Sequence, residues 1–275
     1  MYLDSHQHFW LYDKHQYPWI PTGSPLERDW MPPDLQVELA EVNLTGSIAV
    51  QARQTIEESR WLLALADQFS LIQGVVGWVD LRNERVEDAL AELSQHPKFV
   101  GVRHVLQDEP DDRFMLQREF VRGISKLKQF DLTYDLLIFP KQLPAAIELV
   151  SRFPEQPFVL DHAAKPHIKA GTLSPWREQI RQLAKFPNVS CKVSGMVTEA
   201  DHATWKPADL RPYLDEIFSA FSIDRLMFGS DWPVCLLAAC YEQVFAIVDQ
   251  YVKHFSATDR DALFGGNAAR FYGVR

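Results

Sequence analysis

The stretch YLDSHQH, residues 2–8, decides between the two parallel α/β folds that fit this chain. We predict that it is the first strand. In a doubly wound sheet, the first strand of a nucleotide-binding unit is followed by a glycine-rich GxGxxG loop that approaches the phosphates. His6-Gln7-His8 stands in that place instead. The stretch therefore favours a (β/α)8 TIM barrel, with the doubly wound sheet as the alternative.

The rest of the chain supplies the alternation of strands and helices that a barrel needs. Short apolar runs alternate with longer segments whose apolar residues recur every three or four positions, the period of an amphipathic helix. The predicted strands are residues 2–8, 46–51, 71–79, 99–104, 133–139, 157–161, 189–194 and 225–229. The predicted helices are residues 57–69, 86–93, 114–130, 143–153, 175–186, 207–221 and 241–254. The repeated alternation of strand and helix indicates that the strands pair in parallel. Because a (β/α)8 barrel usually takes about 250 residues, we predict one domain over residues 1–275.

Composition and charge argue against several classes of protein. The 275 residues include 28 Lys and Arg against 37 Asp and Glu, which gives a net charge of −9. No excess of cations is present to neutralise the phosphates of nucleic acid. The apolar runs also fall far short of the roughly 18 residues that a membrane helix needs. We therefore expect neither nucleic acid nor a membrane as a partner.

The first residues and the cysteines bear on the compartment. The chain opens without the basic segment and apolar stretch of an export signal. Its cysteines, Cys191, Cys235 and Cys240, are few and lack CxxC spacing, which is typical of a reducing compartment. We expect a cytoplasmic protein. The sequence does not determine the oligomeric state, and a homo-oligomer is one of the options.

A long irregular segment, residues 9–33, follows the first strand and is rich in aromatic residues and proline. Loops of this length in a compact domain are usually functional or disordered, and the aromatic content argues against disorder. We expect this insertion to cap a site. The alternative is that its rings only pack the loop onto the rim of the barrel.

Ionisable residues gather where the predicted strands end. Asp4, His6 and His8 alternate along the first strand, so we expect all three to face the barrel interior. His162 ends the sixth strand and Asp231 follows the eighth. Catalytic groups of such barrels lie at the C-terminal ends of the strands, so the sequence predicts a site there.

This set of side chains suits the hydrolysis of an activated carbonyl. Three histidines and one aspartate can hold one divalent ion such as Zn²⁺ with room for water, or can polarise a carbonyl oxygen without a metal. Asp231 would take the proton from the attacking water. The structural alternatives are that Asp231 caps the next helix or turn and that His162 is a core histidine bonded to the backbone.

Seven motifs together resemble the lactonase group of the amidohydrolase superfamily. They are DSHQHFW at 4–10, YPW at 17–19, GVRH at 101–104, LDH and KP at 160–166, CKVSG at 191–195, RLMFGSDWPV at 225–234, and GNA at 266–268. The resemblance covers essentially the whole chain. That group includes lactonases of L-fucono-, L-galactono- and L-rhamnono-lactones and the pyrone-dicarboxylate lactonases.

The resemblance implies a catalytic set and a small-molecule lactone as substrate. It places the HxH motif of the family on His6 and His8, the strand-six histidine on His162, and the strand-eight aspartate on Asp231. These four are also the implied metal ligands. The sixth strand does not supply the lysine that bridges two metals in binuclear members, so we expect one metal or none, because members of this group can work without metal.

Other strand ends offer contacts for the substrate. Arg103 and His104 cannot both face the interior, and we favour Arg103. Lys192 and Gln51 are further candidates. Three tryptophans can provide an aromatic platform for a sugar ring, namely Trp19, Trp30 and Trp232.

The expected reaction is hydrolysis of a sugar-derived lactone to the aldonic acid. A dicarboxylate lactone would call for at least two converging arginines, and only Arg103 and Arg53 are placed for that. Metal-dependent decarboxylation is a second enzymatic alternative, because related barrels use the same cluster for it. A non-catalytic binding barrel is the third, and the intact set of three histidines and one aspartate argues against it.

Overall fold

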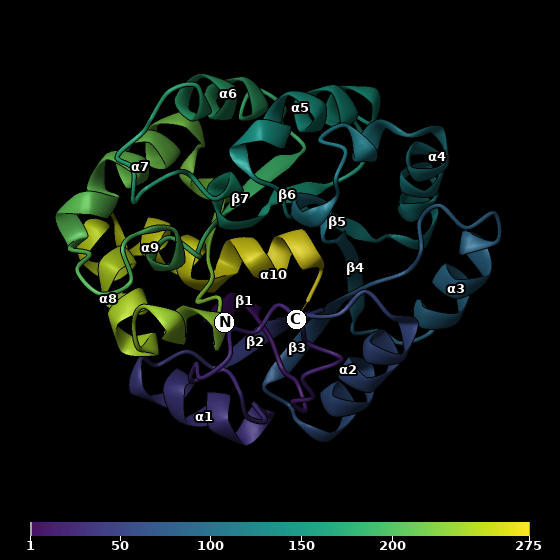
Figure 1. The fold of residues 1–275 in the computed structure, drawn as a ribbon, viewed down its shortest axis with the longest axis horizontal. Coiled ribbons are helices and arrows are strands. Elements are labelled where there is room, and N and C mark those ends of the chain that lie inside the picture. Colours follow the sequence, from purple (N-terminus) through teal and green to yellow (C-terminus); the bar gives the residue numbers. More distant parts are fainter. Residues whose placement is uncertain (1, 275) are drawn as a thin grey trace.

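The computed structural model describes residues 2–274, and eight parallel strands form its centre (Figure 1). Each strand pairs with the next along the chain, from β1 to β8. The strands are β1 (Leu3–Gln7), β2 (Gly46–Val50), β3 (Ile72–Gly77), β4 (Phe99–His104), β5 (Thr133–Leu136), β6 (Phe158–Leu160), β7 (Val189–Val193) and β8 (Leu226–Phe228). Residues just past β8 close the ring, because His8 N donates to Trp232 O over 2.7 Å and Asp231 N donates to His6 O over 2.8 Å.

Helices surround these strands in a ring, as a (β/α)8 barrel requires (Figure 1). They are α1 (Pro32–Glu41), α2 (Ile56–Gln68), α3 (Val86–Leu93), α4 (Arg118–Leu127), α5 (Leu143–Arg152), α6 (Trp176–Leu183), α7 (Pro207–Ala220), α8 (Tyr241–Tyr251), α9 (Ala257–Asp261) and α10 (Asn267–Tyr272). The predicted barrel is confirmed. None of the helices α1 to α10 is long and apolar enough to cross a membrane.

Besides the short α9, two helices lie outside the predicted set. The sequence analysis assigned residues 32–33 to the insertion, but Pro32 opens α1, since proline lacks only an N–H that is unpaired in a first helical turn anyway. The other is α10, which crosses the middle of the ring in Figure 1. Its Ala268 and Tyr272 pack on an apolar layer inside the barrel. This layer consists of Leu3, Ile48, Val50, Val76, Val100, Val159 and Met227.

A bulge in β1 corrects one expectation about the first strand. Asp4 pairs with Ser47 and Gln7 with Ala49, so β1 advances three residues while β2 advances two. One extra residue reverses which side of the sheet the later side chains face. Leu3, His6 and His8 therefore face inward, whereas the carboxylate of Asp4 bonds to Tyr241 of α8 behind the strand. The expectation that Asp4 faces the interior with the two histidines was wrong, because strict alternation ignored the bulge.

The aromatic insertion folds back on itself above the barrel. Trp10 and Trp30 pair through backbone hydrogen bonds of 3.0 and 2.9 Å. Trp10, Tyr17, Ile20 and Leu26 form a small buried cluster. The segment thus has a core of its own, and this core brings its residues 15–19 to the rim of the barrel.

Candidate active site

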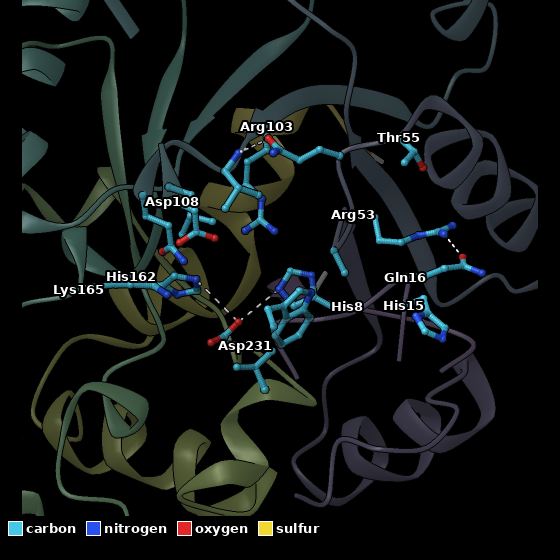
Figure 2. Close-up of a pocket in the computed structure, with 17 residues that line it drawn as sticks. His8, His15, Gln16, Arg53, Thr55, Arg103, Asp108, His162, Lys165 and Asp231 are labelled. Atoms are coloured by element: carbon cyan, nitrogen blue, oxygen red, sulfur yellow. Dashed lines mark hydrogen bonds and ion pairs between the residues drawn. The ribbon is translucent and has the colours of Figure 1, made fainter. Parts of the chain in front are cut away.

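A cavity of about 530 Å³ opens where the strands end. The catalytic candidates His8, His162 and Asp231 form its floor, and Arg103 forms part of its wall (Figure 2). The insertion contributes His15, Gln16 and Trp19, and the loop after β2 contributes residues 52–55. The insertion therefore borders the predicted site, as expected of a cap.

Asp231 lies between the rings of His8 and His162 (Figure 2). Its Oδ1 atom is 3.4 Å from His8 Nε2, 3.7 Å from His6 Nε2 and 3.8 Å from His162 Nε2. The Nε2 atoms of His6 and His8 are 3.2 Å apart. The four side chains come from three separate parts of the chain and converge on a space about the size of one ion or one water molecule.

Backbone geometry fixes two of these side chains. Residues 162–165 all have positive φ, between 48° and 60°, and Asp231 has φ of 58°. Such values are uncommon outside glycine and tend to occur at functional sites. The turn is held by the indole N–H of Trp176, which donates to Ala163 O over 2.7 Å. It directs His162 into the cavity and brings Lys165 to the same wall.

Two glycines make room for the rings. A Cβ on Gly195 would lie 2.5 Å from His162 Nδ1, and one on Gly229 would lie 2.8 Å from His6 Cβ. Neither strand end therefore accepts a side chain while the histidines hold their present positions. The glycines of the GSDWP and VSG motifs thus shape the site because they have no side chain.

The electrostatics of the site keep the histidines neutral and the aspartate ionised. Burial lowers the pKa of His162 to about 4 and also lowers the pKa of His6 and of His8. Burial acts to raise the pKa of Asp231, but the three histidine rings outweigh it and hold that pKa below its usual value. Asp231 can therefore accept a proton, and the rings can donate or coordinate in their uncharged forms.

The hydrogen bond of His8 fixes its tautomer. His8 Nδ1 lies 2.7 Å from Val50 O, and a carbonyl only accepts, so Nδ1 carries the proton. The Nε2 lone pair then faces Asp231 Oδ1 over 3.4 Å. Two acceptors at this distance favour a cation or a shared proton between them.

The donor set suits one divalent cation. His6, His8 and Asp231 place one ligand atom each within 4.8 Å of one another, and His6, Asp161 and His162 form a second such group. Ligand atoms around a tetrahedral zinc ion are about 3.4 Å apart, which matches the distances from Asp231 to the rings. His6, His8 and Asp231, with His162 beside them, would hold the ion.

Charged residues form a buried layer beneath the histidines. Lys192 Nζ lies 2.5 Å from Asp135, 2.9 Å from Asp161 and 3.0 Å from His6 Nδ1. Lys192 is 0 % exposed and is not among the residues that line the cavity. Lys192 therefore supports the ring of His6 from below. The predicted contact of Lys192 with a substrate stays a prediction, because the side chain does not line the cavity.

Arg103 connects this layer to the cavity. It faces inward, as predicted, and pairs with Asp161 over 3.1 Å. Its guanidinium also donates to the carbonyl and the side chain of Gln51. Gln51 is thus a partner of Arg103 and lies fully buried behind it.

The three tryptophans differ in position. Trp19 lines the cavity and is 41 % exposed, so it can contact a substrate. Trp232 is fully buried and packs edge-to-face on Trp30, with 5.0 Å between the ring centres. Neither Trp30 nor Trp232 lines the cavity, so these two rings hold the insertion against the loop after β8.

Several residues of the cavity were not among the sequence candidates. Lys165, His15, Gln54, Gln107 and Asp108 all line it. The signal for Lys165 was its position three residues after His162, but only the left-handed turn places both on one wall. The others lie on loops, where no periodic pattern indicates which side chain faces the cavity.

Comparison with known proteins agrees with this geometry. A family profile described as Amidohydrolase matches residues 3–274. The chain belongs to the amidohydrolase family. The resemblance to the amidohydrolase superfamily seen in the motifs is thereby confirmed.

Three relatives are close to this amidohydrolase in sequence or structure. An L-fucono-1,5-lactonase from Burkholderia multivorans is 44% identical over 99% of this chain and 96% of its own. An L-fucono-1,5-lactonase from Burkholderia ambifaria is 38% identical over 99% of this chain and 95% of its own. A crystal structure of a Burkholderia multivorans amidohydrolase with bound zinc has 44% identity and a TM-score of 0.96, and the match covers 100% of both chains.

Proposed function

We propose that this amidohydrolase hydrolyses a sugar-derived lactone to the aldonic acid. The observation that carries the proposal is the placement of ionised Asp231 among three neutral histidines, of which His8 and His162 lie on the cavity floor and His6 lies buried directly behind them. The two relatives that are named L-fucono-1,5-lactonases and match 99% of this chain support the same reaction. An L-sugar 1,5-lactone is therefore the first substrate to test.

Asp231 is the general base in this proposal. It accepts a proton from the attacking water, and a carboxylate in this role typically contributes about 10²–10⁴-fold to the rate. His6, His8 and His162 surround the place where negative charge develops on the carbonyl oxygen. An uncharged ring that carries its proton on Nε2 can stabilise that charge by donating a hydrogen bond. His8 carries its proton on Nδ1, so this role falls to His6 or His162.

A single metal ion is compatible with these residues. The zinc-bound relative supports zinc as the ion, and His6, His8, His162 and Asp231 would hold it. When bound, a divalent ion polarises the carbonyl and lowers the pKa of water. Whether or not it is bound, the roles of the side chains in orienting the lactone and accepting the proton are the same in this proposal.

The wall of the cavity supports a neutral, hydroxyl-rich substrate. Gln16, Gln54, Gln107 and Asp108 offer hydrogen-bond donors and acceptors, and Trp19 offers a flat apolar face. The dicarboxylate alternative is less well supported, because both arginines are engaged within the protein: Arg103 with Asp161 and Gln51, and Arg53, which also lines the cavity, with Gln16 and Glu58. We place the reaction in carbohydrate catabolism and the enzyme in the cytoplasm, consistent with three free cysteines.

Acid release from a panel of L- and D-aldono-lactones, with a pyrone dicarboxylate included, tests the proposal. We expect turnover of one sugar configuration, measured with a pH indicator with and without chelator and with added Zn²⁺. The Asp231→Asn variant should retain the fold and lose at least about 10²-fold in kcat. Silence across the panel, or near-normal turnover in Asp231→Asn, would contradict the proposal.

A further inference from the structure

A fully buried carboxylate lies behind the catalytic residues, outside the cavity. Asp4 is 0 % exposed and is not among the cavity-lining residues. Its two oxygens accept four hydrogen bonds from groups of β1, the loop after β8, and α8. Burial raises the pKa of Asp4 to about 6, while these four donors favour its ionised form, which is expensive to bury unless it is fully paired. The position therefore needs an explanation beyond packing.

The first oxygen of Asp4 contacts the backbone on both sides of the site. Oδ1 accepts from His6 N over 3.0 Å and from Ser230 N over 2.9 Å. His6 is a catalytic candidate, and Ser230 directly precedes the base Asp231. Asp4 Oδ1 thus joins the backbone of His6 to the backbone of Ser230, the residue before the general base.

The contact with His6 N also accounts for the bulge in β1. It occupies the N–H of His6 inside the segment, residues 4–7, where the register shifts by one residue. Without that extra residue, the inward position of Leu3 would put Ser5 and Gln7 inside, and His6 would face the helices. The side chain of Asp4 therefore helps set which residues of the HxH motif enter the barrel.

The second oxygen holds the loop that presents Asp231. Oδ2 accepts from Ser230 Oγ over 2.5 Å and from Tyr241 Oη over 2.9 Å. The Ser230 hydroxyl oxygen in turn accepts from Trp232 N over 2.9 Å. Asp231 is thus flanked by two residues tied to Asp4, one directly and one through Ser230, while its own φ stays at 58°.

We propose that Asp4 is a positioning residue that aims both His6 and Asp231 from behind the barrel wall. The catalytic consequence rests on the proposed lactone hydrolysis, whereas the structural consequence does not. Groups that orient active-site residues in this way typically change activity by about 10–100-fold when removed. Asp4 touches neither substrate nor water in the cavity, so its loss acts on kcat through geometry.

The test compares Asp4→Asn with a destabilised control. Asparagine keeps the size, but it has one acceptor oxygen in place of two, so it cannot accept from the N–H groups of His6 and Ser230 and from the hydroxyls of Ser230 and Tyr241 together. We expect kcat to fall about 10–100-fold with KM within about threefold. The control is Asn267→Ala, which removes two hydrogen bonds of 2.7 Å, to Ile223 O just before β8 and to Leu226 O at its start, at the other end of the barrel. Its Tm should fall while kcat stays unchanged.

A second readout does not depend on turnover. Ring ¹⁵N signals of His6 and His8 should move in Asp4→Asn and stay in place in Asn267→Ala. Unmoved ring signals together with normal kcat in Asp4→Asn would overturn the proposal. If the wild-type protein hydrolyses no lactone, the proposed function fails, and the ring signals alone decide the role of Asp4.

A milder variant covers the case in which Asp4→Asn does not fold. Ser230→Ala removes the 2.5 Å bond to Oδ2 and leaves the bond between Asp4 and His6 N. We expect roughly a 3–10-fold lower kcat and ring signals of His6 that move less than in Asp4→Asn. A Ser230→Ala variant with normal kcat would argue that the network is structural only.

Discussion

Gly195 lies against the ring of His162, and replacing it with alanine should displace that ring. The added Cβ would lie 2.5 Å from His162 Nδ1 and 2.6 Å from its Cγ, where ordinary contact begins at 3.4 Å. Strand β7 holds the backbone of Gly195, so the ring must recede by about 0.9 Å. The substitution thus moves the ring of His162 while the imidazole group itself stays the same.

The expected loss follows from that distance. A misplacement of about 1 Å costs on the order of 10²-fold in rate, so we expect kcat of Gly195→Ala to fall by that factor. The backbone adds a separate cost, because Gly195 has φ of +62°. A left-handed alanine is less stable than glycine by about 1–2 kcal/mol, which lowers Tm by about 2–8 °C in a domain of this size.

Gly171→Ala separates the two effects. Gly171 has φ of +64° with nothing within 4 Å of an added Cβ, so it carries the backbone cost alone. Thermal unfolding should show a Tm lowered by the backbone cost alone in Gly171→Ala and lowered further by overpacking in Gly195→Ala. Acid release from the lactone should show a low kcat only in Gly195→Ala. Equal kcat in the two proteins would refute the reasoning that Gly195 sets the position of His162.

Two more predictions concern Glu58 and Arg103. Burial raises the pKa of Glu58 from 4.5 to about 7. The folded state then binds this proton more tightly than the unfolded state, so the stability falls as pH rises from 4.5 to 7, by at most about 3 kcal/mol. In Glu58→Gln the Tm should lose this part of its pH dependence, and equal slopes in thermal scans from pH 5 to 8 would contradict it. Arg103→Lys keeps the charge but loses the fork that joins Asp161 to Gln51, so kcat/KM should fall roughly tenfold. A change below twofold in steady-state kinetics would argue against this role.

The barrel and the convergence of the site could be predicted from local patterns. Each strand is a short apolar run between helical segments, and parallel strands place their C-terminal ends at one mouth. Such a rule brings His8, His162 and Asp231 together without knowledge of any contact. It also implies that only one of Arg103 and His104 faces the interior, because neighbouring residues on a regular strand face opposite sides, and the structure identifies Arg103 as that residue.

The remaining details depend on features that no local pattern encodes. The bulge that turns His6 inward involves a contact of Asp4 with the backbone of His6, and Asp4 is in turn held by Ser230, which is 226 residues away in sequence. Lys192 faces the interior as expected, but its depth below the cavity follows from its ion pairs with Asp135 and Asp161. The burial of Trp232 likewise follows from the fold of the insertion. Tertiary contacts decide how deeply each candidate residue lies below the cavity, and the sequence alone does not show those contacts.

The left-handed turn at residues 162–165 separates the part of the cavity that resists redesign from the part that tolerates it. Four consecutive non-glycine residues in this region are costly, and Ala163 and Ala164 are fully buried. Larger or branched side chains would strain the wall that carries His162 and Lys165. The opposite wall consists of residues 15–19 and 52–55, which lie on surface loops that accept new lengths and side chains. The enzyme can therefore acquire a different substrate range by exchanging these loops while its hydrolytic geometry stays unchanged.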